Sequence, residues 1–262
     1  MSQFARARTR LPCFSVTLLS PLLAIAVSLL SVCTISASPA RALSLFDETF
    51  DEADWVHTKI IDSTSGAAGT FTAMQESTGG NPGPYQSGTH TWNNGYIAIA
   101  HIFSGAGVYD PGTQGALALL DWSVDLGVPV STNTEFTDVA ATLVVMQGGN
   151  FYLPDPFSAL PFASHGGGFT QLEQSLVEGD LVLALGSGVD LNSHPDFSSS
   201  GAPLSFGFAT VNSATGSRTT HWVADNYQLV PEPSTGLLLA IGFLALAKIN
   251  SDSRRRAART SH

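Results

Sequence analysis

The sequence predicts an all-β fold, an antiparallel β-sandwich flanked by two chain ends that do not belong to it. Short runs rich in β-branched and aromatic residues recur between residues 45 and 229, separated by Gly, Pro, Asn and Ser clusters. Several runs alternate apolar and polar residues with a period of two, and no long segment has a helical period. About ten short strands in one domain favour two packed antiparallel sheets.

The expected strands follow one another along residues 43–229, which we take as the domain. They are Leu45–Phe50, Trp55–Ile61, Gly69–Glu76, Tyr96–Phe103, Ala116–Leu126, Val139–Gln147, Asn150–Leu153, Asp180–Leu185, Leu204–Val211 and Thr220–Leu229. Gln171–Val177 fits either a short helix or a further strand. Long loops are expected at Gly79–Tyr85, Asp155–Gly168 and Asp190–Pro203. The first and last strands should pair or lie close together, and a jelly roll is the most specific expectation.

The N-terminus has the three parts of a secretion signal. Arg6, Arg8 and Arg10 give a positive start, an apolar stretch follows over residues 16–32, and Ala40-Arg41-Ala42 is a small-x-small cleavage pattern. We therefore predict a signal peptide over residues 1–42, cleaved after Ala42 by signal peptidase. The alternative is a retained N-terminal anchor helix.

The C-terminus carries a second apolar stretch followed by positive charge. We predict a transmembrane helix over about residues 235–250, which is short for a span, and a basic cluster at 254–259 that contains Arg254, Arg255 and Arg256. Because positive residues stay on the cytoplasmic side, both chain ends should face the cytoplasm while the domain is exported. The protein would thus be held only transiently in the inner membrane.

The residues that precede this helix give a resemblance to a known family. Pro231-Glu232-Pro233, then a short apolar helix, then terminal arginines, resembles the PEP-CTERM sorting signal over residues 230–262. The resemblance implies recognition of Pro231, Glu232 and Pro233 by an exosortase in a Gram-negative bacterium that also makes extracellular polysaccharide. It also implies delivery to the cell surface or beyond. The alternative is an ordinary tail anchor with a Pro-rich hinge.

The charge of the domain excludes some partners. Between Leu43 and Val230 there are 19 acidic residues, and only Lys59 and Arg218 are basic, which gives a formal charge of −17. Such a surface repels nucleic acid. It suits divalent cations, and Ca²⁺ takes oxygen ligands. Both cysteines lie in residues 1–42, so the domain has neither disulfides nor thiol chemistry.

The domain also resembles jelly-roll modules that precede this kind of sorting tail. The resemblance rests on Phe46 to Phe50, Gly79–Tyr85, Tyr109-Asp110-Pro111 with Gln114-Gly115, and Ala224–Tyr227. Some modules of this fold bind carbohydrate, which implies polysaccharide as a ligand.

Candidate site residues are few. Tyr85, Trp92 and Tyr109 fall in or beside expected loops, where aromatic rings stack on sugars or simply cover the sandwich edges. Glu48 lies between Phe46 and Phe50 on an expected strand, and it could share a structural Ca²⁺ with Asp225. A salt bridge to Lys59 or Arg218, or a solvated strand edge, are the alternatives.

The sequence selects no catalytic residue. No two histidines have metal-binding spacing, no serine lies in a nucleophile elbow, and nothing selects one carboxylate pair among many. The leading interpretation is a non-enzymatic, exported surface or matrix protein that binds carbohydrate. The alternatives are an extracellular polysaccharide hydrolase or lyase, and a purely structural matrix protein.

Overall fold

The computed structural model describes residues 44–233, except 106, 130–138, 157–159, 165 and 167. Its elements, in chain order, are β1 (Leu45–Asp47), η1 (Glu52–Asp54), β2 (Trp55–Asp62), β3 (Thr70–Gly80), β4 (Gly83–Phe103), α2 (Pro111–Gln114), β5 (Leu117–Gly127), β6 (Val139–Gln147), β7 (Asn150–Pro154), β8 (Phe162–Ala163), β9 (Thr170–Leu176), η2 (Glu178–Asp180), β10 (Leu181–Ala184), β11 (Val189–Asp190) and β12 (Leu204–Pro233).

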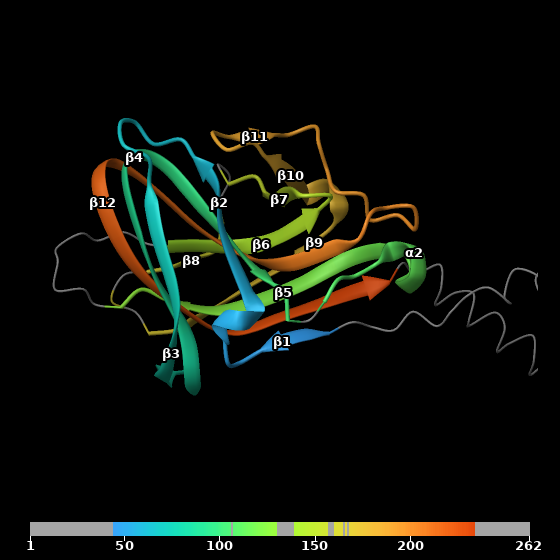
Figure 1. The fold of residues 1–262 in the computed structure, drawn as a ribbon, viewed down its shortest axis with the longest axis horizontal. Coiled ribbons are helices and arrows are strands. Elements are labelled where there is room, and N and C mark those ends of the chain that lie inside the picture. Colours follow the sequence, from blue (N-terminus) through green and yellow to red (C-terminus); the bar gives the residue numbers. More distant parts are fainter. Residues whose placement is uncertain are drawn as a thin grey trace, which may run out of the picture. The chain divides into compact units, whose positions relative to one another are not determined.

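The strands form an all-β antiparallel sandwich in which two long strands, β4 and β12, belong to both layers. The first layer runs β11-β10-β7-β6-β12-β4-β2, using the first half of β12 and the second half of β4. The second layer contains β3, the first half of β4, the second half of β12, β5 and β9. β4 and β12 stay paired while they curve from one layer into the other (Figure 1). The fold class predicted from the sequence is confirmed, and the jelly-roll connectivity stays a prediction.

The two terminal strands pair, as the sequence predicts. β1 lies antiparallel to β12, with Leu45 opposite Leu229 and Asp47 opposite Tyr227. Phe46 is 52% exposed, whereas Phe50 is fully buried. The strand ends at Asp47, because the Asp47 carboxylate accepts hydrogen bonds from the backbone N–H groups of Thr49 and Phe50 and turns the chain.

An aromatic cluster fills the space between the layers. The Trp55 ring lies between Phe50 and Phe103, with both ring centroids 5.0 Å away, and meets Phe208 and Tyr227 edge-on. Inward-facing residues of β5 complete this core, since Leu120, Trp122, Val124 and Leu126 are buried on one face of the strand. The alternation that places Leu120, Trp122, Val124 and Leu126 on one face of the expected strand Ala116–Leu126 therefore predicted the buried face correctly.

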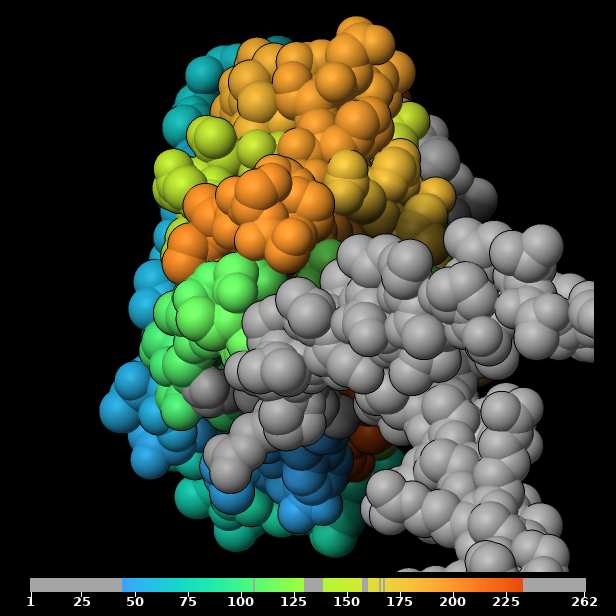
Figure 2. All heavy atoms as spheres, turned by 90° about the vertical axis from the view of Figure 1, so that its right-hand side faces the viewer, coloured from blue at the N-terminus to red at the C-terminus, as the bar shows by residue number. Residues whose placement is uncertain are grey.

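Other segments of the chain cover the outer face of the first layer. Ile61 of β2 forms a parallel bridge to Gly186, between β10 and β11, and the Gly186 N–H donates to the Ile60 carbonyl over 3.1 Å. Apolar residues pack beneath, including Val144, Leu153 and Ala209, all fully buried. The segment between β10 and β12, amber to orange, covers the upper part of the view in Figure 2, next to α2 in green. An open binding face must therefore be sought on the second layer.

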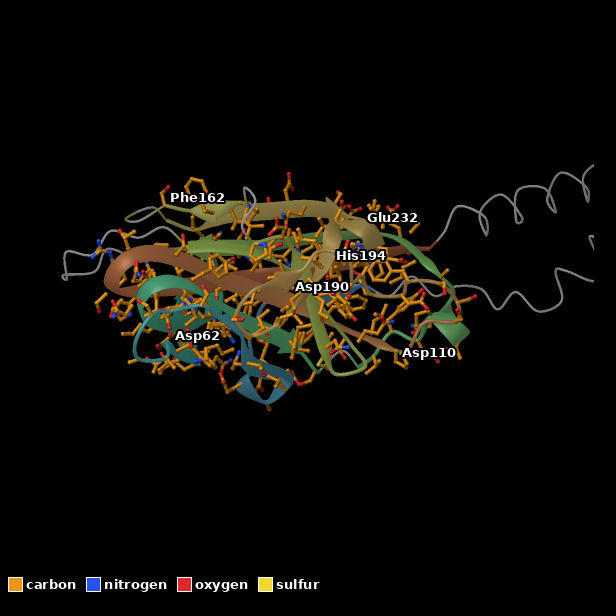
Figure 3. All side chains as sticks on the ribbon, turned by 90° about the horizontal axis from the view of Figure 1, so that it is seen from above. Asp62, Asp110, Phe162, Asp190, His194 and Glu232 are labelled. Carbon is orange, nitrogen blue, oxygen red and sulfur yellow. The ribbon has the colours of Figure 1, made fainter. Side chains whose placement is uncertain are left out.

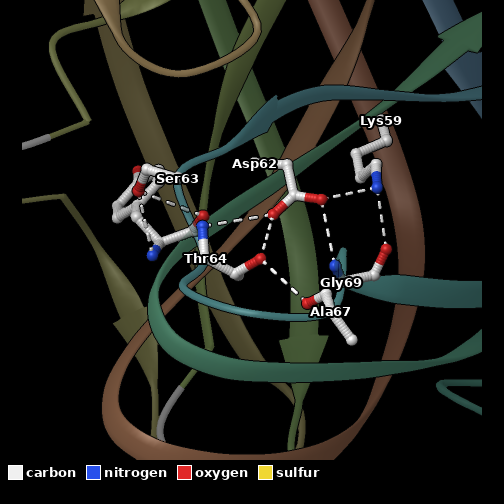
Figure 4. A network of polar contacts seen from close by, with 7 residues as sticks. Lys59, Asp62, Ser63, Thr64, Ala67 and Gly69 are labelled. Atoms are coloured by element: carbon white, nitrogen blue, oxygen red, sulfur yellow. Dashed lines mark hydrogen bonds and ion pairs between the residues drawn. The ribbon is translucent and has the colours of Figure 1, made fainter.

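The loop after β2 is held by a polar clamp around Asp62 (Figure 4). Asp62 accepts hydrogen bonds from Thr64 and from the Gly69 N–H, and it pairs with the Lys59 ammonium at 2.6 Å. Lys59 also donates to the Gly69 carbonyl over 2.8 Å. Lys59 therefore stabilises the loop formed by residues 63–69.

The local structure corrects two expectations and decides between two alternatives for a third segment. The predicted loop Gly79–Tyr85 is a two-residue turn at Asn81-Pro82 between β3 and β4, so residues 83–95 are strand. Gln171–Val177, left open between helix and strand, corresponds to strand β9. The two expected strands after residue 204 are one continuous β12.

The expectations for the chain ends lie outside the described residues. These are the signal peptide with Ala40 and Ala42, the transmembrane helix at about 235–250, and Arg254, Arg255 and Arg256. Among the residues that the structure describes, none of the helices has the length and apolar character needed to cross a membrane.

Candidate functional site

The outer face of the second layer carries a regular array of mostly polar side chains. Cross-strand neighbours on β3, β4 and β12 form three successive rows: Thr70, Thr91 and Thr219; Thr72, Thr89 and His221; Met74, Ser87 and Val223. Side chains within the array also bond to one another. The Thr89 hydroxyl lies 2.9 Å from His221 Nδ1, and the hydroxyls of Thr91 and Thr219 are 3.1 Å apart.

This face is hollowed where the second and third rows meet. The hollow has a volume of about 490 Å³. Its lining contains Thr72, Met74, Tyr85, Ser87, Gly88, Thr89, Pro129, His221, Trp222 and Val223. We call this the sheet-face hollow. Hydroxyl and imidazole groups line its floor, and Tyr85 contributes the aromatic ring.

Tyr85 is placed at the hollow by the start of β4 and supported from the side. Its ring makes an edge-to-face contact with Phe169, with the ring centroids 6.3 Å apart. The floor beside it depends on Gly88, because a Cβ at this position would lie 2.3 Å from the Trp222 ring. Ser87 donates to a Glu76 carboxylate oxygen over 3.1 Å, so a carboxylate borders the hollow.

Of the three aromatic candidates, only Tyr85 is available at the surface. Trp92 is 2% exposed and packs with Ile97 and Ile99, because it lies in the middle of β4 and not in a loop. Tyr109 is also 2% exposed, and its hydroxyl donates to the Gly115 carbonyl over 2.7 Å. The expectation of exposed rings at loop tips is therefore wrong for Trp92 and Tyr109.

A second, more acidic hollow lies on the same face, over β5, β9 and β12. It has a volume of about 520 Å³. Its lining contains Asp121, Trp122, Ser123, Glu173, Gln174, Ser175, Gln228 and Val230. Asp121 accepts a hydrogen bond from Ser175 across the two strands, with the oxygens 2.5 Å apart. Because Trp122 is buried, this hollow presents carboxylates, hydroxyls and amides but no aromatic ring face.

Glu48 does not occupy the position that the sequence predicted. It lies exposed in the bend after β1, so it does not share an apolar strand face with Phe46 and Phe50. The buried acid of this segment is Asp47, which accepts hydrogen bonds from the Trp55 indole N–H over 2.7 Å and from nearby backbone. Lys59 binds Asp62, so the predicted alternative of a Glu48–Lys59 salt bridge is wrong.

Asp225 is a buried carboxylate with a defined environment. It accepts hydrogen bonds from the backbone N–H groups of Asn81 and Asn226. Burial raises the pKa of this carboxyl above its ordinary value, the two N–H groups lower it, and the charges of Asp125 and Glu48 raise it further. In the part of the chain that the structure describes, no three His, Cys, Asp or Glu side chains are grouped to hold a metal ion. A calcium ion shared by Glu48 and Asp225 stays a prediction.

Pro231, Glu232 and Pro233 form the end of β12. Pro231 lies opposite Leu120 and Glu232 opposite Leu119, so the motif continues the pairing with β5. Pro231 is buried and Glu232 is exposed at the margin of the domain (Figure 3). The predicted tail over residues 230–262 therefore begins within a strand.

A chain of buried histidines between the layers was not predicted from the sequence. His90 and His101 are fully buried, and the Thr210 hydroxyl bridges them at 3.0 Å and 2.8 Å. His101 in turn lies 2.8 Å from His57, measured between the two Nδ1 atoms. These residues are far apart in the sequence, so no spacing rule could bring them together.

Comparisons with known proteins leave the family of this chain open. No family model matches the chain, and no curated protein matches it. Among solved structures, the family 11 carbohydrate-binding module of a Clostridium thermocellum cellulosomal cellulase superposes with a TM-score of 0.35 at 14% identity, covering 76% of this chain and 98% of that chain. A xylan-binding domain from Paenibacillus barcinonensis superposes with a TM-score of 0.37 at 10% identity, covering 76% and 99%. A mannan-recognising carbohydrate-binding module gives 0.35 at 10% identity, covering 74% and 99%.

Proposed function

We propose that this protein is an exported cell-surface or extracellular-matrix protein that binds a neutral polysaccharide through the sheet-face hollow. The observation that carries the proposal is the combination of the Tyr85 ring with the hydroxyls of Thr72, Ser87 and Thr89 in one hollow on an open sheet face. Sugar rings present apolar C–H faces and hydroxyl edges, and this surface offers partners for both.

The negative charge of the domain limits the classes of polysaccharide that it can bind. With 19 acidic and 2 basic residues between positions 43 and 230, long-range repulsion disfavours uronic-acid or sulfated polymers. The Glu76 carboxylate and the His221 ring add hydrogen-bonding groups at the hollow. A neutral glycan is therefore the ligand that this surface supports best.

Delivery is the second part of the proposal. The predicted signal peptide would export the domain, and the Pro231-Glu232-Pro233 tail would hold it transiently in the inner membrane until an exosortase acts. The supporting observations are the sequence patterns at both ends. The strand position of the motif adds a condition, because an enzyme that binds it as an extended peptide must first separate it from β5.

The test is a glycan array with the full chain, followed by titration of the glycans that bind. Tyr85→Ala should weaken binding by up to about tenfold, which corresponds to about 0.5–1.5 kcal/mol for an aromatic contact. Phe162→Ala is the matched control, because Phe162 is 53% exposed on β8 and does not line the hollow. Equal loss in both variants would contradict the assignment of the hollow.

The two alternatives give different results in the same assay. New reducing ends or unsaturated products from a bound glycan would indicate a hydrolase or lyase. Absence of any glycan binding together with self-association would indicate a purely structural matrix protein.

A further inference from the structure

The turn between β3 and β4 closes one end of the sheet-face hollow. Asp225 points outward from β12, because it lies opposite the outward-facing Asp125 and two residues beyond Val223, which lines the hollow. Its side chain is nevertheless fully buried. The turn covers it, since the Asn81 N–H donates to the Asp225 carboxylate and a Cβ at Gly80 would lie 2.6 Å from Asp225 Oδ2.

Side-chain hydrogen bonds fasten this turn to the outer face. Asn226 Nδ2 donates to the Asn81 carbonyl over 2.8 Å and to Asp125 Oδ2 over 2.7 Å. Asn81 Nδ2 also donates to Asp125 Oδ2 over 3.2 Å. Asn226 lies between the β12 residues that line the two hollows, so the turn separates the sheet-face hollow from the acidic hollow.

An aromatic pair extends this barrier toward β9. Tyr85 lies beside the turn on β4, and Phe169 directly precedes β9, with the two ring centroids 6.3 Å apart. Strands β12 and β5 run between β4 and β9, so the two rings meet over the outer face of the sheet. We call the Asn81-Pro82 turn, Tyr85 and Phe169 together the ridge.

The opposite end of the hollow is open. Thr70, Thr91 and Thr219 form the next row of the array beyond the hollow, and all three are exposed. Tyr85 and Thr91 are separated along β4 by a distance of about 20 Å, at 3.3–3.4 Å per residue. Hydroxyl groups therefore line the face from the ridge to the threonine row.

We propose that the sheet-face hollow binds the end of a neutral polysaccharide chain, with the terminal sugar at Tyr85 and the following sugars over the threonine row. This inference rests on the proposed function. An internal segment of a chain must leave its site in two directions, and the ridge blocks one of them. A chain end leaves in one direction only, which is what this hollow allows.

Glu76 is the residue that distinguishes the terminal sugar. It lies opposite Tyr85 in the register of β3 and β4, at the closed end, and its carboxylate accepts a hydrogen bond from Ser87 over 3.1 Å. A terminal sugar has one more free hydroxyl than an internal one. A carboxylate has several acceptor positions, so Glu76 can accept this hydroxyl while it holds Ser87.

The test counts binding sites on one glycan cut to different chain lengths. The glycan that the array selects is shortened by limited acid hydrolysis and titrated calorimetrically with the full chain. We expect the number of sites per gram of glycan to rise in proportion to the number of chain ends. Reduction of the terminal sugar to an alditol then identifies the end: lost binding assigns the reducing end to the hollow, and unchanged binding assigns the other end.

Two variants test the closed end. Glu76→Gln should weaken binding about fivefold, because hydrogen bonds to a charged acceptor are roughly twice as strong as neutral ones. Glu173→Gln is the matched control, because Glu173 lines the acidic hollow beyond the ridge, and it should leave the affinity unchanged. An equal loss in both variants would mean that the chain crosses the ridge, and it would overturn the inference.

The number of sites also separates this inference from the proposed function. A number of sites per gram that does not change with chain length would overturn chain-end binding and leave glycan binding in place. Absence of glycan binding by the native chain would overturn both.

Discussion

Acidification should destabilise this domain through its buried histidines, and His90 gives the size of the effect. His90 is fully buried, and burial lowers its pKa from 6.5 to about 4, against the hydrogen bond to Asn212 that raises it. Between these values the unfolded chain binds a proton that the folded chain does not. The free energy of unfolding is therefore highest above about pH 6.5. It decreases as the pH falls, and the His90 contribution stops changing below about pH 4.

The magnitude follows from the two pKa values. A difference of one pKa unit is worth about 1.4 kcal/mol, so His90 alone costs about 3 kcal/mol well below pH 4 and about 2 kcal/mol at pH 5. With a urea dependence of about 2 kcal/mol per molar, the unfolding midpoint should fall by about 1 M between pH 7 and pH 5. His101, whose pKa burial lowers well below 6.5, acts in the same direction.

The control separates His90 from the other groups that titrate. His90→Gln should reduce the pH-dependent loss by about 2 kcal/mol, whereas Thr72→Val on the exposed face changes no titrating group and should leave it unchanged. Asp225 acts in the opposite sense, because its raised pKa favours the folded state as the pH falls, but both variants retain it. An NMR titration that gives His90 a pKa near 6.5 would refute the reasoning, and so would equal pH dependence in the native chain and His90→Gln.

Two further outcomes can be measured on the same chain. Gly88→Ala should lower stability by about 1–3 kcal/mol, because the new Cβ would lie 2.3 Å from the Trp222 ring. Gly179→Ala, where the added Cβ meets open space, should change stability little. Equal melting temperatures for the two variants would contradict the packing argument. Chelation of divalent ions should lower the melting temperature if Glu48 and Asp225 hold Ca²⁺, and Asp225→Asn is the matched variant. A melting curve that neither chelator nor added Ca²⁺ changes would contradict this site.

The sequence predicted the fold class and the strands whose pattern has a period of two. Leu120, Trp122 and Val124 alternate with polar residues, and alternation on a half-buried strand is set by local physics. The first half of β4 was missed, because Pro84, Gly88 and Asn94 are residues typical of turns. Pairing with β12 overrides that tendency, and Gly88 is needed there to accommodate Trp222.

The candidate sites were harder to predict than the strands. The sheet-face hollow brings together Thr72, Tyr85 and His221, which lie on three strands whose register no local pattern specifies. The buried histidines likewise come from β2 and β4, and only the pairing of β2 with β4 places His57 opposite His101. Spacing rules detect residues that share one element, and these residues do not.

The strand position of the sorting motif makes its two prolines a clean test of the delivery proposal. Neither Pro231 nor Pro233 has a backbone N–H, so neither can donate a ladder hydrogen bond, and the pairing with β5 shifts its register between Glu232 and Pro233. Replacing both with alanine removes no backbone bond to β5, but it should lower stability by about 1–2 kcal/mol, because alanine leaves the unfolded chain more freedom and the Pro231 side chain is buried.

If an exosortase reads the prolines, the Pro231→Ala, Pro233→Ala chain should remain uncleaved and membrane-bound while its domain folds normally. Glu232→Gln serves as a companion variant, because Glu232 is exposed and contributes a charge without shaping the strand. Fractionation of cells and mass measurement of the released chain give the readout. Normal release of the proline variant would mean that Pro231 and Pro233 serve only to end the sheet, where residues without an N–H donor protect a strand edge from further pairing.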